Sequence, residues 1–361
     1  MNDCLRKKIG AALSAAVFAL NYSPWVQAET RNLSGARAAQ ASASIAGRML
    51  IPGGQVVGVA LKTEGVLVVA RGNQSGQGSE LRVGDVILSV MGQKVDSAKD
   101  LQALVNASHT DQVEMSVLRR GRAVTVNAQA GRDGADGPRR LGVWVRDSTA
   151  GVGTLSYIDP LSGAYGALGH AIVDGDTGDM VVVREGAILS ADVVGIARGD
   201  STRAGELRGS FLKENRQIGS LDLNSVFGIY GVMDVPSGNA IYPDGLPVAG
   251  RDEVRTGPAE ILATVDGEGM RAYSVEITKC VRQDAPAQKG ITLRVTDERL
   301  LAKTGGIVQG MSGSPIIQNG KIVGAVTHVY LSDSAQGYGM YIEWMLEQSD
   351  RIGKNRSADA A

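Results

Sequence analysis

The sequence has few of the residues on which several common protein classes depend. Of its 361 residues only two are cysteines, Cys4 and Cys280, and three are histidines. A chain with so few cysteines has no disulfide framework. Its 37 basic and 38 acidic residues nearly balance, which argues against a nucleic-acid partner. The longest apolar stretch near the start, residues 9–20, is shorter than the roughly 20 residues of a membrane-spanning helix.

The first 28 residues have the pattern of an export signal. Arg6-Lys7-Lys8 precedes the apolar stretch, and Val26-Gln27-Ala28 offers small residues for cleavage after Ala28. We therefore predict residues 1–28 to be a signal peptide, with a retained membrane anchor as the alternative. Residues 29–48 are rich in Ala and Ser, and we interpret them as a tether. Cleavage would remove Cys4 and leave Cys280, which we interpret as a half-buried strand cysteine because no glycine-rich turn flanks it.

Residues 49–131 form the next block, which is rich in short apolar runs. We predict strands at 55–61 and 66–70, a helix at 97–107 with Ser97 as N-cap, and a hairpin around Arg120-Gly121. The segment Leu81-Arg-Val-Gly-Asp-Val-Ile-Leu-Ser-Val90 resembles that of a PDZ domain. This resemblance implies that an extended peptide binds along a strand edge. The peptide-binding residues that it implies are Gly53, Gly54, Val56, Val57, Gly58 and Val59. A purely structural β-module is the alternative.

Residues 132–361 are predicted to form the second domain. Short apolar runs separated by glycine turns predict an antiparallel barrel or sandwich. Residues 343–349 predict a short terminal helix. The fold class expected for the whole chain is mostly β.

The segment Gly310-Met311-Ser312-Gly313-Ser314-Pro315 has the pattern of a loop that displays a nucleophilic hydroxyl. Glycines at both sides of Ser312 allow a tight turn with exposed N–H groups, which stabilise a developing oxyanion. Ser314 is the alternative nucleophile. Because a serine hydroxyl is weakly nucleophilic at neutral pH, the hypothesis requires a base and a group that orients it.

Three histidines compete for the role of base. His170 follows a run of small residues at the edge of an apolar strand, which favours a cleft position. His328 ends the strand that follows the serine loop and ranks second, while His109 suits a solvated surface role. For the orienting acid, Asp297 at a strand end is a fair candidate, and spacing leaves three others open: Glu298, Asp266 and Asp252.

The acidic segment 174–179 resembles a calcium-binding loop only in part. Gly178 and Asp179 stand in the reverse of the order that an EF-hand needs, so we interpret the segment as a turn. No metal and no organic cofactor is predicted.

The serine motif, with Gly324-Ala-Val-Thr-His-Val329 and Gly166-Ala-Leu-Gly-His-Ala-Ile172, closely resembles the SpoIVB peptidase family of stage IV sporulation serine proteases. The resemblance implies a PDZ domain followed by a chymotrypsin-like double β-barrel. It also implies the catalytic triad Ser312, His170 and Asp297, with the N–H groups of Gly310 and Ser312 as the oxyanion hole. Met311 replaces the aspartate that precedes the serine in trypsin-like enzymes, which rules out a trypsin-type activating salt bridge.

The family's activity sets the functional expectation. It implies an exported endopeptidase, acting between mother cell and forespore, that cleaves itself and a membrane-bound regulatory subunit of an intramembrane protease. Two alternatives are an HtrA-like quality-control protease and a non-catalytic PDZ scaffold. The position of the PDZ block before the peptidase block argues against the first, and the complete candidate triad argues against the second.

Overall fold

The computed structural model describes residue 45 and residues 47–72, 79–132, 137–198, 204–210, 216–234 and 238–359. The predicted signal peptide and most of the predicted tether lie outside these residues. Among the described residues, no helix is long and apolar enough to cross a membrane. The elements in chain order are β1 (Met49–Pro52), β2 (Val56–Arg71), β3 (Val86–Val90), β4 (Gln93–Lys94), α2 (Ala98–Ala107), β5 (Gln112–Arg119), β6 (Arg122–Gln129), β7 (Gly131–Arg132), β8 (Arg139–Arg140), β9 (Val143–Ile158), β10 (Ala164–Ala167), β11 (Val183–Ser190), β12 (Asp192–Ala197), β13 (Glu206–Ser210), β14 (Gln217–Ser220), β15 (Leu223–Ser225), β16 (Gly228–Val232), β17 (Leu246–Pro247), η2 (Arg251–Glu253), β18 (Gly257–Ala263), β19 (Arg271–Cys280), β20 (Ile291–Val295), α3 (Glu298–Thr304), β21 (Pro315–Gln318), β22 (Lys321–Tyr330), β23 (Asp333–Tyr341) and α4 (Ile342–Asp359).

The PDZ unit contains α2 and the strands around it, and its helix and hairpin confirm the sequence predictions. Ser97 caps α2 by accepting a hydrogen bond from the Asp100 N–H at 3.1 Å. Strands β5 and β6 form the expected hairpin, in which Arg120 and Gly121 both have positive φ, as a tight two-residue turn requires. Its core consists of buried aliphatic residues from these strands and from Leu101 and Val105 of α2.

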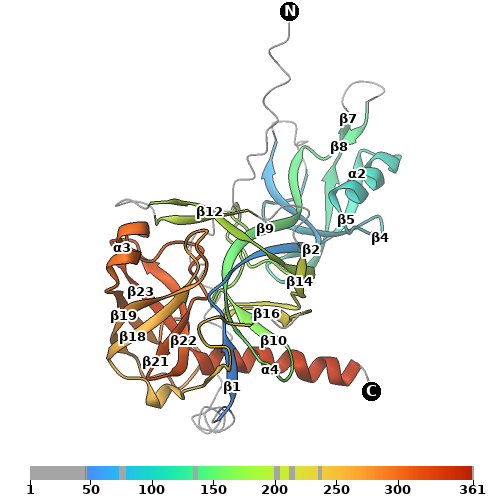
Figure 1. The fold of residues 1–361 in the computed structure, drawn as a ribbon. Helices are drawn as coiled ribbons and strands as arrows, with labels where there is room; N and C mark the ends of the chain where they lie inside the picture. Colours follow the sequence, from blue (N-terminus) through green and yellow to red (C-terminus); the bar gives the residue numbers. More distant parts are fainter. Residues whose placement is uncertain are drawn as a thin grey trace, which may run out of the picture.

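Two long strands, β2 and β9, belong to both the PDZ unit and the peptidase. The two strands pair antiparallel over two stretches: residues 67–71 of β2 with 143–146 of β9, and residues 56–62 with 148–154. The first stretch lies in the PDZ unit. The second lies in a curved sheet with β10, β11 and β16, which has a core of its own. Figure 1 shows β2 and β9 running between the end of the molecule that carries α2 and the end that carries the C-terminal strands.

The last six strands close into a barrel in the order β18-β19-β20-β23-β22-β21. The barrel encloses the largest hydrophobic core. The fold is therefore mostly β with a PDZ domain, as predicted. In place of the two closed barrels of the prediction, the described residues form a curved sheet and one closed barrel. The predicted boundary at residue 131 differs from this arrangement, because β1 and the first part of β2 pair with peptidase strands.

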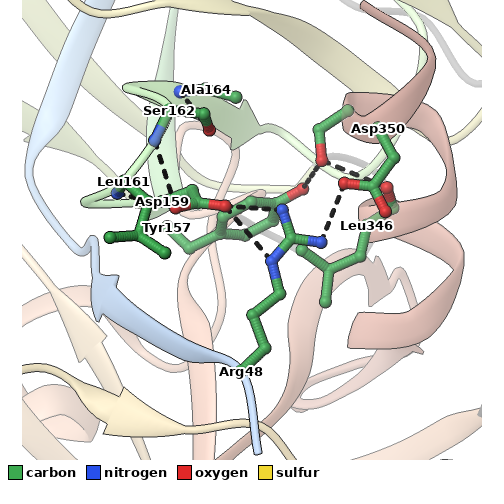
Figure 2. A network of polar contacts seen from close by, with 9 residues as sticks. Arg48, Tyr157, Asp159, Leu161, Ser162, Ala164, Leu346 and Asp350 are labelled. Carbon is green, nitrogen blue, oxygen red and sulfur yellow. Dashed lines mark hydrogen bonds and ion pairs between the residues drawn. The ribbon is translucent and has the colours of Figure 1, made fainter. Parts of the chain in front are cut away.

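Helix α4 is longer than the predicted helix at 343–349, and it is anchored by a polar network that Figure 2 shows. The Arg48 guanidinium contacts Asp159 at 2.6 Å and Asp350 of α4 at 2.8 Å. The Tyr157 hydroxyl donates to the Ser349 hydroxyl at 3.0 Å. This network joins the residue before β1, the end of β9 and the C-terminal helix.

Candidate active site

Ser312 lies in the loop between α3 and β21, and two glycines shape this loop. Gly310 and Gly313 have φ values of +95° and +100°, which disfavour any side chain. A Cβ on Gly313 would also lie 2.0 Å from the Thr154 carbonyl oxygen and 2.6 Å from the Leu168 nitrogen. Only glycine fits there, because the serine loop lies directly against strand β9.

The environments of the two serines support Ser312 over Ser314. Ser314 is fully buried, and its hydroxyl has no hydrogen-bond partner among the described residues. The Ser312 side chain is half-buried, and its hydroxyl donates to the Thr327 carbonyl oxygen at 3.0 Å. A substrate can therefore reach Ser312, whereas Ser314 would need the loop to open.

The N–H groups predicted for the oxyanion hole differ from their neighbours in one respect. The N–H groups of Met311 and Gly313 donate to the carbonyls of Val308 and Val326. Those of Gly310 and Ser312 have no hydrogen-bond partner among the described residues. The loop thus leaves the two predicted donors available for an oxyanion.

Thr154 of β9 holds the serine loop in place. Its N–H donates to the Ser312 carbonyl at 3.1 Å, and its hydroxyl donates to the Gly310 carbonyl at 2.6 Å. The residue is 1 % exposed. Sequence reasoning missed this contact, because an isolated threonine in a strand carries no signal of its distant partners.

His170 follows β10 after two residues with positive φ, Leu168 and Gly169. Its Nδ1 lies 2.9 Å from the Ala171 carbonyl oxygen. If Nδ1 carries the proton and donates to this carbonyl, Nε2 is left as the proton acceptor. Burial lowers the pKa of His170 below 6.5, and the Ala171 contact offsets part of this effect. Gly169 lies against Thr327, whose carbonyl accepts from Ser312, so the predicted base lies in the neighbourhood of the predicted nucleophile.

His328, the second-ranked base, lies beside His170. The ring centroids are 5.7 Å apart and the ring planes are tilted by 42°. Burial, reinforced by His170 and Lys289, lowers the pKa of His328 to about 3. Its Nδ1 is buried and has no hydrogen-bond partner among the described residues. His328 therefore lines the site as an uncharged imidazole near pH 7.

Asp297 serves as the N-cap of α3. Its carboxylate accepts from the N–H groups of Arg299 and Leu300 and pairs with the Arg299 guanidinium at 2.7 Å. The Ser274 N–H also donates to it, at 3.2 Å. The Arg299 contact foremost lowers the pKa of Asp297 to about 2, so the carboxylate is ionised at neutral pH. The carboxylate contacts Ser274, Arg299 and Leu300 rather than His170, and its predicted catalytic role stays a prediction.

Two other acidic residues of the sequence analysis, Asp266 and Asp174, have local partners. Asp266 pairs with Lys303, and Asp174 accepts from the N–H groups of Asp176 and Thr177 in a turn. Cys280 is half-buried at the end of β19, as predicted, and burial raises the pKa of its thiol. Over the described ranges, no group of three or more His, Cys, Asp or Glu residues is placed to hold a metal.

The predicted peptide-binding edge of the PDZ domain is wrong. The N–H groups of Gly53 and Gly54 donate to the Ser156 and Leu155 carbonyls. Residues 56–59 pair with β9 on one side, and residues 57–59 pair with β11 on the other. Both edges are filled because this half of β2 belongs to the peptidase sheet, so Gly53, Gly54, Val56, Val57, Gly58 and Val59 cannot accept a further strand.

Comparison with known families finds two matches in the chain. The SpoIVB peptidase S55 model matches residues 137–346, and a PDZ domain model matches residues 77–119. No curated protein matches the chain.

Several solved structures are similar to parts of it. The active form of the Rv3671c protease from M. tuberculosis is 16 % identical, with 57 % of this chain and 75 % of that chain covered and a TM-score of 0.35. The HtrA-type protease AlgW with decapeptide is 11 % identical, covering 89 % of this chain and 68 % of that chain, also at a TM-score of 0.35. The PDZ domain of an SdrC-like protein from Listeria monocytogenes is 15 % identical over 23 % of this chain and 90 % of that chain, at a TM-score of 0.21.

Proposed function

Because the chain belongs to the SpoIVB peptidase family, a family of serine peptidases, and carries a PDZ domain, we propose that it is an exported endopeptidase that makes limited regulatory cuts. The proposed substrates are the protein itself and a membrane-bound regulatory subunit of an intramembrane protease in sporulation signalling. The pattern of residues 1–28 supports export. The observation that carries the catalytic part is the reachable Ser312 hydroxyl in a loop with two available N–H donors.

In the proposed mechanism, Ser312 attacks the scissile carbonyl. Its hydroxyl leaves the Thr327 carbonyl and gives its proton to Nε2 of His170, while the Ala171 carbonyl holds Nδ1. The tetrahedral oxyanion accepts hydrogen bonds from the N–H groups of Gly310 and Ser312. The imidazolium then protonates the leaving amine, and water releases the acyl group by the same steps.

Asp297 enters this mechanism through the family resemblance, as the group that orients His170. Its low pKa supports the role, because an orienting carboxylate must be charged. The Ala171 carbonyl is the group that contacts Nδ1 in the present structure.

Labelling with a fluorophosphonate tests the assignment, because this reagent needs an activated serine but no knowledge of the cleavage site. We expect the full chain to be phosphonylated at Ser312, with the site identified by mass spectrometry. Ser312→Ala and His170→Ala should lose labelling by a factor on the order of 10⁴ or more. His109→Ala, which alters an exposed histidine of the PDZ unit, should label normally. Modification at Ser314, or labelling that survives Ser312→Ala, would contradict the proposal.

A further inference from the structure

Strands β12 and β13 form a hairpin that, within the described ranges, belongs to neither the curved sheet nor the barrel. Val194 on its outer side is 66 % exposed, whereas Val193 and Leu207 are buried in the largest core. The Arg198 guanidinium donates to the Ala302 carbonyl of α3, and Figure 1 shows β12 beside this helix. The hairpin is therefore anchored on the barrel, next to the segment that leads from α3 into the serine loop.

The start of β13 pairs with the serine loop itself. Glu206 and Gln309 form an isolated parallel bridge. The Gln309 N–H donates to the Gly205 carbonyl at 2.7 Å, and the Leu207 N–H donates to the Gln309 carbonyl at 2.8 Å. Gln309 directly precedes Gly310, whose N–H is one of the two predicted oxyanion donors. The hairpin thus holds both backbone groups of the residue before this donor.

The hydrogen bond from Leu207 fixes the peptide plane between Gln309 and Gly310. A trans peptide unit is planar, and its C=O and N–H point in opposite directions. Because β13 holds the Gln309 carbonyl, the Gly310 N–H points away from β13, and in the described part of the chain it has no partner. A flip of this plane would break the bond and turn the Gly310 N–H out of the oxyanion hole. Gly310, with a φ of +95°, offers little steric resistance to such a flip.

The two peptide planes on either side of Gly310 are held by different strands. Thr154 of β9 donates to the Gly310 carbonyl and so fixes the plane that follows. Leu207 of β13 fixes the plane that contains the Gly310 N–H. The Leu207 side chain is 2 % exposed, and its Cβ lies 3.0 Å from the position that a Cβ on Gly310 would take. Backbone and side chain of Leu207 therefore act on the same glycine.

We propose that the Leu207 N–H is a positioning group for catalysis, which holds the plane of residues 309–310 so that the Gly310 N–H faces the oxyanion. The hairpin of β12 and β13 then serves the reaction without contacting the substrate. This inference rests on the proposed function, since it requires Ser312 to react. A hairpin with a structural role alone would stabilise the fold and leave the reactivity of the folded protein unchanged.

The first experiment removes the donor by Leu207→Pro in the full chain. A proline is compatible with this position, because the Leu207 N–H is directed at Gln309 and not at β12. Fluorophosphonate labelling of the folded protein should slow by about tenfold to 100-fold. Leu207→Ala truncates the side chain but keeps the N–H, and it should label at least about tenfold faster than Leu207→Pro. Equal rates in these two variants would overturn the proposal.

A control variant separates the hydrogen bond from the stability of the hairpin. Val193→Ala removes a buried side chain of β12 and leaves the contact with Gln309 in place, so it should lower the free energy of unfolding without slowing labelling. The pH profile supplies a second readout. Leu207→Pro should slow labelling at every pH without moving the midpoint, because the contacts of His170 do not involve β13. A shifted midpoint would place the effect on the base and refute the assignment to the oxyanion hole.

An amide-to-ester exchange keeps the test decisive if Leu207→Pro fails to fold. Incorporation of leucic acid at position 207 removes the N–H and retains the leucine side chain, and it should slow labelling by about tenfold or more. The same exchange at Val194, an exposed position of the hairpin, should label at the unmodified rate. An ester at 207 that labels as fast as the ester at 194 would contradict the proposal. Failure of the unmodified protein to label at Ser312 would instead remove the proposed function.

Discussion

Thr154 links strand β9 to the catalytic loop, and its hydroxyl can be removed with little change of shape. Thr154→Val leaves the Gly310 carbonyl without the hydrogen bond that it accepts at 2.6 Å. This carbonyl belongs to the chain segment between the two predicted oxyanion donors, the N–H groups of Gly310 and Ser312. The substitution should therefore make the positions of both N–H donors less ordered, while the nucleophile Ser312 itself is unchanged.

The expected magnitude follows from the burial of the contact. Thr154 is 1 % exposed, and a buried acceptor that loses its donor costs about 1–3 kcal/mol. If about 1.4 kcal/mol of this falls on the ordered state of the loop, the aligned population drops about tenfold. Complete loss of an oxyanion donor lowers the rate by a factor on the order of 10²–10³. Partial misalignment of the two N–H donors should therefore lower the labelling rate less, by about tenfold.

The assay is the second-order rate constant of fluorophosphonate labelling, together with the free energy of unfolding in urea. Thr154→Ser keeps the hydroxyl and should label within about twofold of the unmodified protein. Thr125→Val, at an exposed position of β6, controls for the substitution itself. Labelling of Thr154→Val at the unmodified rate, with a measurable loss of stability, would refute the idea that this hydrogen bond orders the oxyanion hole.

Three further predictions concern the ionisable residues His170, Asp297 and Asp159. Because burial lowers the pKa of His170 below 6.5, labelling should fall on the acidic side with a midpoint below pH 6.5, and a midpoint above that value would contradict a buried neutral base. Asp297→Asn should keep the cap of α3, because an asparagine side chain accepts the same backbone hydrogen bonds. Through the proposed triad role it should slow labelling about 100-fold or more. Equal labelling rates in Asp297→Asn and Arg299→Gln would remove Asp297 from the mechanism. Burial alone would raise the pKa of Asp159, but hydrogen bonds from Arg48 and from the Leu161 and Ser162 N–H groups, together with the Arg48 charge, outweigh burial and lower the pKa. Asp159→Asn should therefore cost about 1–3 kcal/mol above pH 3.8, and this difference should vanish as the pH falls through the lowered pKa. A difference that persists at lower pH would contradict the ion-pair explanation.

Local features of the site could be predicted from the sequence, because they depend on a few adjacent residues. The glycines around Ser312 require positive φ, and the Ser97 cap and the hairpin at Arg120-Gly121 depend on neighbouring positions. The pairing of Leu67 with Arg146 does not depend on neighbouring positions, because these residues lie far apart in the sequence. Alternation of apolar residues predicts that a segment is a strand, but the choice of partner strand depends on the packing of the whole chain.

This limit explains the error in the peptide-binding edge. The sequence predicts residues 55–61 and 66–70 as two separate strands of one PDZ domain. The structure joins them into the single strand β2, and residues 143–146 lie beside its second half. Gly65 of β2 has a φ of +72°. A glycine in this conformation allows a turn, but it also allows the bend by which one strand passes from one unit into another.

The shared strand also connects the PDZ unit to the catalytic loop. Val145 lies in the PDZ half of β9, and Thr154, nine residues later, makes two hydrogen bonds to the serine loop. At about 3.3 Å per residue the two positions are roughly 30 Å apart, so the PDZ half of β9 does not contact Ser312. Both positions nevertheless belong to one hydrogen-bonded strand, which β2 holds along most of its length. The carbonyls of Gly310 and Ser312 therefore accept hydrogen bonds from the same strand that pairs with β2 in the PDZ unit.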